Sequence, residues 1–145
     1  MIFSENRDDL RQFYVDVWRK TKNSENLEPL EAIVSKIIEM HSEYHSLLDN
    51  SETAKSKEFS PDLGEGNPFA HMGLHIGIHE QLTTHRPPEL KGLYQKALLK
   101  LQDPHEVEHL IMNCLAEMVW VSQKNGIPFN EKKYVKCVKG NIKNL

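Results

Sequence analysis

The sequence predicts an all-α fold, a single-domain helical bundle of about five to six helices over residues 1–145. Apolar residues recur at steps of three and four along most of the chain, whereas no run of alternating β-branched residues is bounded by turns. Pairs of an N-cap residue and a proline mark several helix starts. With 145 residues, 39% of them hydrophobic, the chain has the length and the apolar material for one core.

The first half of the chain predicts two helices and a loop. The first helix is expected over about 5–20, with Ser4 as its N-cap. The second begins near Pro29, which suits a first-turn position, and continues to about residue 49. The polar segment at about 50–66 is rich in turn formers, so we expect a long loop there that is either mobile or a lid.

The second half predicts four more helices. Asn67 before Pro68, and Asp103 before Pro104, each have the form of an N-cap and a first helical residue. Asn130 can cap a last short helix. The expected helices cover about 68–84, 88–102, 104–124 and 130–140.

Composition excludes several classes of protein. A formal charge of −3 and a pI near 6.2 argue against nucleic acid as a partner. The start has no basic region followed by an apolar one, and no segment is apolar enough to span a bilayer, so we expect a cytoplasmic protein with no membrane partner. Cys114 and Cys137 are not spaced as C-x-x-C, so we expect neither a thiolate zinc site nor a disulfide framework. Any metal would then be held by nitrogen and oxygen.

Seven of the eight histidines stand in three short runs, MHSEYH, HMGLHIGIHE and PHEVEH, at steps of four residues. The runs contain His41 and His45; His71, His75 and His79; and His105 and His109. In a helix a four-residue step turns the side-chain direction by only about 40°, so two such histidines can bind one ion. On the second and third expected helices they project among apolar residues. On the fifth they share a polar stripe with Glu106, which either faces water or lines a pocket.

A buried imidazole needs a hydrogen-bond partner or a metal, and several buried together disfavour their own protonation. A divalent transition ion, such as zinc, iron or manganese, resolves this conflict because it binds neutral imidazole. The candidate ligands are His41, His45, His71, His75, His105 and His109, with His79 and Glu106 as weaker candidates. Six imidazoles exceed the three or four that one zinc accepts, so either two ions bind or some histidines only orient the ligands.

The sequence leaves the reaction and the substrate open. The segment from His105 to His109 fits H-E-x-x-H, but no histidine follows that could be the third ligand of a zinc protease, and no strand is expected. If the site is catalytic, it would activate water for hydrolysis or react with oxygen. The alternative is a non-enzymatic interaction or regulatory module with a buried histidine network. Gly73-x-x-x-Gly77 would allow a homo-oligomer, and the oligomeric state stays open.

The runs HSEYHSLL, GNPFAHMGLHIGIHEQL with RPP, and DPHEVEHLIMNCLAEMVWVSQKNG resemble a bacterial family catalogued as domain of unknown function 1841, over about residues 7 to 138. Its pattern matches His41, Glu43, Tyr44, His45, Asn67, Pro68, Phe69, His71, His75, His105, Glu108 and His109. The chain departs from it at Ser42, where a proline is usual, and at His79, which weakens His79 as a ligand. The resemblance implies an all-helical cytoplasmic protein and no established activity.

Overall fold

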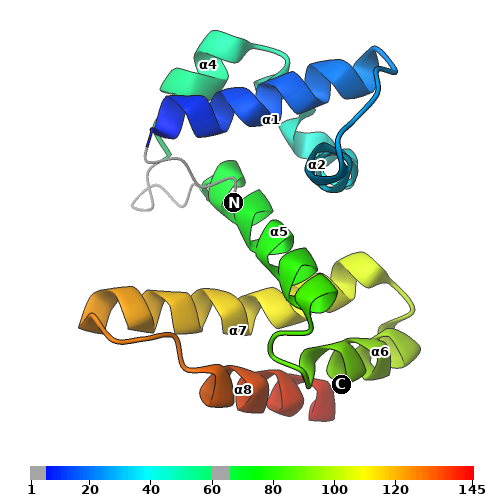
Figure 1. The fold of residues 1–145 in the computed structure, drawn as a ribbon, viewed down its shortest axis with the longest axis vertical. Helices are drawn as coiled ribbons and strands as arrows, with labels where there is room; N and C mark the ends of the chain where they lie inside the picture. The colour runs from blue at the N-terminus through cyan, green and yellow to red at the C-terminus, as the bar shows by residue number, and fades with distance from the viewer. Residues whose placement is uncertain (1–5, 60–65) are drawn as a thin grey trace. The chain divides into compact units, whose positions relative to one another are not determined.

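The computed structural model describes residues 6–59 and 66–145, and in this part of the chain it contains helices and no strand (Figure 1). The predicted all-α class is confirmed, but the expected number of helices is wrong, because the described residues form eight α-helices and one 3-10 helix. These are α1 (Arg7–Lys22), α2 (Pro29–Glu39), η1 (Ser42–Tyr44), α3 (His45–Leu48), α4 (Ser51–Ser56), α5 (Pro68–Thr84), α6 (Leu90–Leu101), α7 (Pro104–Asn125) and α8 (Glu131–Lys143).

The additional helices all lie between α2 and α5. The second helix does not continue to residue 49, because the chain leaves helical geometry at His41, where φ is −122° and ψ is 69°. The expected loop at 50–66 begins instead with α4, whose first turn is capped by the Asn50 side chain accepting from the Thr53 amide. The part of that loop at 60–65 lies outside the described residues, and so do Ser4 and the expected start of the first helix.

The other helices begin where side-chain caps allow. Asn6 caps α1 by accepting from the amides of Asp8 and Asp9. The Asn67, Asp103 and Asn130 side chains accept from backbone amides at the starts of α5, α7 and α8. Each cap satisfies an amide that has no partner within its own helix.

The chain divides into two compact units, an N-terminal unit (Met1–Ile76) and a C-terminal unit (Gly77–Leu145). The boundary falls inside α5, which is one continuous helix and contributes residues to both units. In the N-terminal unit, α1 packs against α2, α3 and α4. Its core consists of the buried side chains of Tyr14, Val15, Val17, Val34, Ile37, Ile38, Leu48, Ala54, Phe69, Met72 and Ile76. The single-domain organisation stays a prediction.

In the C-terminal unit, α6, α7 and α8 each pack against the other two, and α8 runs back along α7 (Figure 1). A disulfide joins Cys114 of α7 to Cys137 of α8, with their Cα atoms 5.8 Å apart. The expectation that these cysteines form no disulfide is therefore wrong: they are 23 residues apart in sequence, and the pairing of the two helices brings them together. None of the described helices is both long and apolar enough to cross a membrane.

Candidate functional site

Three histidines of the N-terminal unit lie together, and we call them the N-terminal histidine group: His41, His71 and His75. Their ring centroids are 5.0 Å apart for His41 and His71, and 4.9 Å apart for each of the other two pairs. Nε2 of His75 lies 3.3 Å from Nε2 of His71. His41 and His75 are buried, so water cannot solvate their rings freely.

The break after α2 turns His41 toward α5. Its Nδ1 lies 2.7 Å from the carbonyl oxygen of Ile37. A carbonyl can only accept, so Nδ1 carries the hydrogen and Nε2 keeps its lone pair, which is the arrangement of a metal-binding histidine held by its other nitrogen. The Tyr44 ring stacks on the His41 ring, with their centroids 5.2 Å apart. Burial, and secondly the charge of Glu43, raise the pKa of the Tyr44 phenol, so this ring is neutral at neutral pH.

His45 has a different environment from His41. Its ring stacks on Trp18 with centroids 4.1 Å apart, and its Nε2 donates to the carbonyl oxygen of Ile38 at 2.8 Å. Trp18 in turn donates from Nε1 to Asp49, at 2.8 Å, and Lys22 pairs with the same carboxylate oxygen at 2.6 Å. The structure therefore places His45 against Trp18 and does not bring it into the N-terminal histidine group.

In the C-terminal unit, His105 and His109 lie one turn apart on α7, with ring centroids 4.2 Å apart. Both side chains are half-buried, and the Nε2 atom of His109 is buried. The polar stripe expected on this helix does not face water uniformly. Glu106 is exposed, whereas the two imidazoles are half-buried.

His79 pairs with a carboxylate. Its Nε2 lies 3.0 Å from Oε1 of Glu108, which is buried. Counting residues along the helix does not predict that Glu108 is buried, because α7 is apolar on nearly all sides and the count does not identify which side faces inward. The Glu108 charge also acts on Tyr94 of α6: burial, and secondly this carboxylate, raise the pKa of the Tyr94 phenol.

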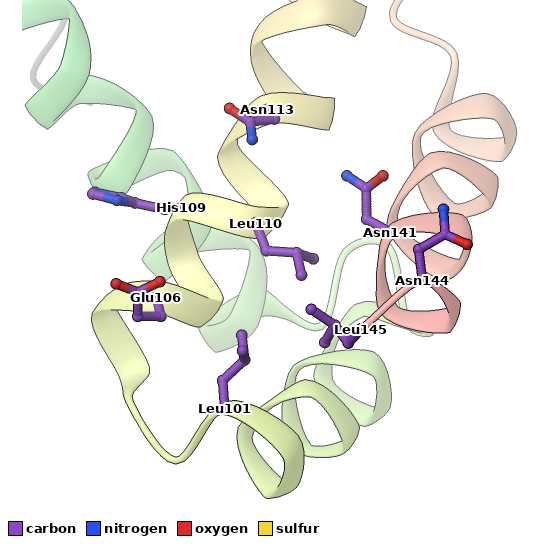
Figure 2. A pocket seen from close by; sticks show the side chains of 8 residues that line it. All are labelled: Leu101, Glu106, His109, Leu110, Asn113, Asn141, Asn144 and Leu145. Atoms are coloured by element: carbon purple, nitrogen blue, oxygen red, sulfur yellow. The ribbon is translucent and has the colours of Figure 1, made fainter.

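Glu106 and His109 lie at the edge of a pocket of about 410 Å³ (Figure 2). The lining residues are Leu101, Glu106, His109, Leu110, Asn113, Asn141, Asn144 and Leu145. The polar stripe of α7 thus forms one wall of a pocket and is also open to water, so both expectations for it hold in part.

The histidines fit a transition metal by donor type and by spacing. Neutral imidazole nitrogen is a good ligand for zinc and iron, whereas manganese favours oxygen ligands. Two nitrogens bound to one tetrahedral zinc, each at about 2.0–2.1 Å, lie roughly 3.3–3.4 Å apart. The Nε2 atoms of His71 and His75 have this separation, 3.3 Å. The same distance also allows one imidazole to donate a hydrogen bond to the other.

Comparison with protein families matches residues 6–140 to the one described as a domain of unknown function, DUF1841. The matched region contains all three histidine runs, α1 to α7 and most of α8. The resemblance seen in the sequence is thereby confirmed. Searches of curated proteins and of solved structures found no match to the chain.

Proposed function

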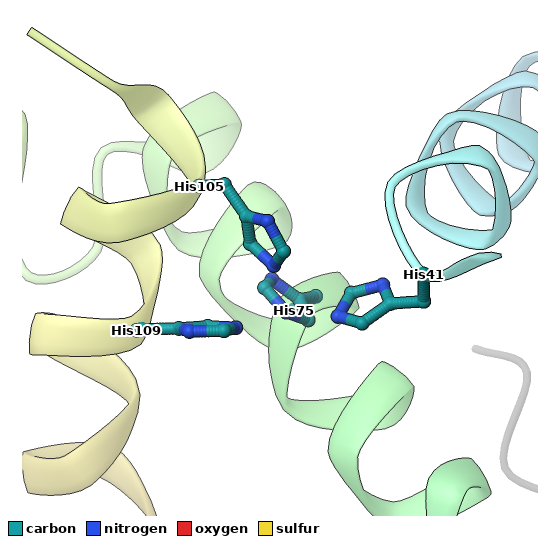
Figure 3. A group of neighbouring side chains, drawn as sticks. All are labelled: His41, His75, His105 and His109. Carbon is teal, nitrogen blue, oxygen red and sulfur yellow. The ribbon is translucent and has the colours of Figure 1, made fainter. Parts of the chain in front are cut away.

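Because the chain belongs to the DUF1841 family, whose description names no activity, its function must be argued from the site itself, and we propose that it binds a divalent transition-metal ion through histidines. The proposed ligands are His41 and His75 of the N-terminal unit and His105 and His109 of the C-terminal unit, each of which offers one ring nitrogen (Figure 3). Of the sequence candidates, His71 adjoins these ligands, whereas His45, His79 and Glu106 are not proposed as ligands.

The observation that carries the proposal is the pairing of imidazoles within each unit: the ring centroids of His41 and His75 are 4.9 Å apart, and those of His105 and His109 are 4.2 Å apart. Two buried or half-buried imidazoles held at either distance would repel each other if both were protonated. A bound cation stabilises the neutral form of the rings in each pair because it binds their nitrogen lone pairs. The His41 tautomer set by Ile37 gives its Nε2 the protonation that a metal ligand needs.

Contacts within the C-terminal unit support the proposed ligands on α7. Glu108, the residue before His109, pairs with His79. His79 stands one helical turn after His75 on α5. Glu108 stands between His105 and His109 in the sequence. Its contact with His79 can hold α7 to α5, although Glu108 is not itself a proposed ligand.

Bound at this site, the metal would supply either Lewis-acid activation of water or reactivity toward oxygen. The two corresponding enzymatic functions are a metal-dependent hydrolase and an oxygen-reactive enzyme. The protein's own residues would bind the ion, hold His41 in one tautomer through Ile37 and exclude water around His75. A small-molecule substrate and a cytoplasmic location remain parts of this proposal.

The experiment is a zinc titration in competition with a chromophoric chelator at neutral pH. We expect the wild type to bind one zinc per chain, and His75→Ala to bind it more than about 100-fold more weakly, because one of four ligands is lost. His45→Ala is the matched control, since His45 is a histidine of the same sequence run as His41 but stacks on Trp18. Equal zinc affinity in the wild type and His75→Ala would contradict the proposal.

The second candidate is a metal-free interaction or regulatory module. It is favoured by the pair of His71 and His75, because their Nε2 atoms lie within hydrogen-bond distance at 3.3 Å. A chelator distinguishes the two candidates. Removal of a bound metal lowers the melting temperature of the metal protein, whereas a hydrogen-bonded histidine network is unaffected by the chelator.

A further inference from the structure

The pocket beside His109 has a mixed lining, and His109 is the one lining residue that is also a proposed metal ligand. One wall is the face of α7 with Glu106, Leu110 and Asn113, and the facing wall is the end of α8 (Figure 2). Leu101, the last residue of α6, lies at the edge. With a volume of about 410 Å³, it is within the size range of small-molecule sites.

The two walls are held at a fixed distance by covalent and polar contacts. The Cys114–Cys137 disulfide joins α7 to α8 directly beside the pocket residue Asn113. The Asn141 side chain donates from Nδ2 to Sγ of Cys114 at 3.3 Å. The Lys100 ammonium of α6 donates to the carbonyl oxygen of Ile142 at 3.4 Å. The pocket is therefore built on cross-linked helices, which reduces the ordering that a ligand would have to impose on it.

The lining chemistry defines what the pocket would recognise. Glu106 is its one acidic side chain, and an exposed carboxylate there attracts a cation. Three asparagine amides, of Asn113, Asn141 and Asn144, each present both a donor and an acceptor, as a ligand amide does. Three leucine side chains, of Leu101, Leu110 and Leu145, supply an apolar surface.

We propose that this pocket binds small aliphatic amino amides as the substrate class of the metal site. The ligand ammonium pairs with Glu106, the ligand amide pairs with the asparagine amides, and the alkyl group contacts the leucines. This inference rests on the proposed function, because His109 both lines the pocket and is a proposed metal ligand.

The test uses the full-length, disulfide-intact protein after incubation with zinc, and the probe is leucinamide, which has an ammonium, an amide and an isobutyl group. Calorimetric titration should show saturable binding of one leucinamide per chain. Glu106→Gln should weaken it about tenfold, through loss of a charge-assisted hydrogen bond. N-acetyl-leucinamide, which lacks the cation, should bind the wild type about tenfold more weakly for the same reason.

The matched control is Glu117→Gln, which removes an exposed carboxylate of α7 outside the pocket lining and should leave leucinamide binding unchanged. The inference is overturned if leucinamide does not bind saturably, if Glu106→Gln binds it as the wild type does, or if the acetylated probe binds equally well. Zinc content is measured on the same samples. Leucinamide binding without zinc retains the pocket and rejects the metal site, whereas zinc without leucinamide binding rejects the pocket alone.

Discussion

Nε2 of His75 lies 3.3 Å from Nε2 of His71, one turn earlier on α5. The helix sets this separation through the four-residue spacing of the two residues, and a hydrogen bond of this length can orient the proposed ligand His75. His41 joins the pair from a different element, because the chain leaves α2 at this residue. The N-terminal histidine group therefore combines a local pair on one helix with a histidine that tertiary structure brings to it.

His45 is expected to act on the fold and not on metal. His45→Ala loses the stacking on Trp18 and the hydrogen bond to Ile38, which together should lower the free energy of unfolding by about 1–2 kcal/mol. Urea denaturation of the metal-free protein measures the loss, and metal titration of the same variant should give the wild-type stoichiometry. Loss of metal binding in a folded His45→Ala would show that His45 is a ligand.

Asp49 should make the stability depend on acidic pH. The Lys22 ammonium, and secondly the Trp18 indole, lower the pKa of the Asp49 carboxyl below its usual value of 3.8. A lowered pKa stabilises the folded state at pH values above the ordinary pKa of the group. This stabilisation is lost as the pH falls through the lowered pKa. Asp49→Asn should therefore be less stable than the wild type at pH 6, and the difference should be smaller at pH 2. A difference of equal size at both pH values would contradict this.

Arg11 should be a major stabilising residue of the N-terminal unit. Its guanidinium is buried and donates to the carbonyl oxygens of Ala54, Lys55 and Lys57 at 3.1, 3.3 and 2.8 Å, at the end of α4. Arg11→Met keeps the apolar stem but leaves these carbonyls without their donor, so we expect a loss of about 3 kcal/mol in urea denaturation. The control, Arg7→Met, removes an exposed ion pair with Glu58 and should have a much smaller effect. Similar losses in both variants would be inconsistent with the burial of Arg11.

The disulfide between α7 and α8 should contribute to stability. It closes a loop with a sequence separation of 23 residues, for which chain entropy predicts a contribution of about 3 kcal/mol. Denaturation with and without dithiothreitol measures the difference. Thiol titration of the unreduced, unfolded protein is the check, and two reactive thiols there would mean that Cys114 and Cys137 are not bonded.

Much of the fold could be predicted from local signals. The pairs Asn67-Pro68 and Asp103-Pro104 located the starts of α5 and α7, because capping depends on neighbouring residues alone. The break at His41 could not be predicted, because apolar residues keep their helical spacing through Tyr44 and Leu48. A proline at position 42 would have indicated it, since a residue before proline avoids helical geometry, but this chain has Ser42.

The parts of the site that depend on tertiary contacts were less predictable. The pair His71 and His75 follows from spacing on one helix, whereas the burial of Glu108 depends on what packs around α7. The four-residue spacing predicted that the side chains of His41 and His45 point in the same direction. The structure separates them, because one stacks on Tyr44 and the other on Trp18. Metal binding by these histidines stays a prediction.

The most direct test of the central claim is elemental analysis by mass spectrometry of untagged protein, purified without chelator or added metal and quantified per chain. The account predicts about one zinc or iron per wild-type chain, and less than about a tenth of that in the His75→Ala, His109→Ala double variant, which lacks two of the four proposed ligands. A wild-type ratio near zero that persists after incubation with zinc, iron and manganese would contradict the account. An unchanged ratio in the double variant would also contradict it.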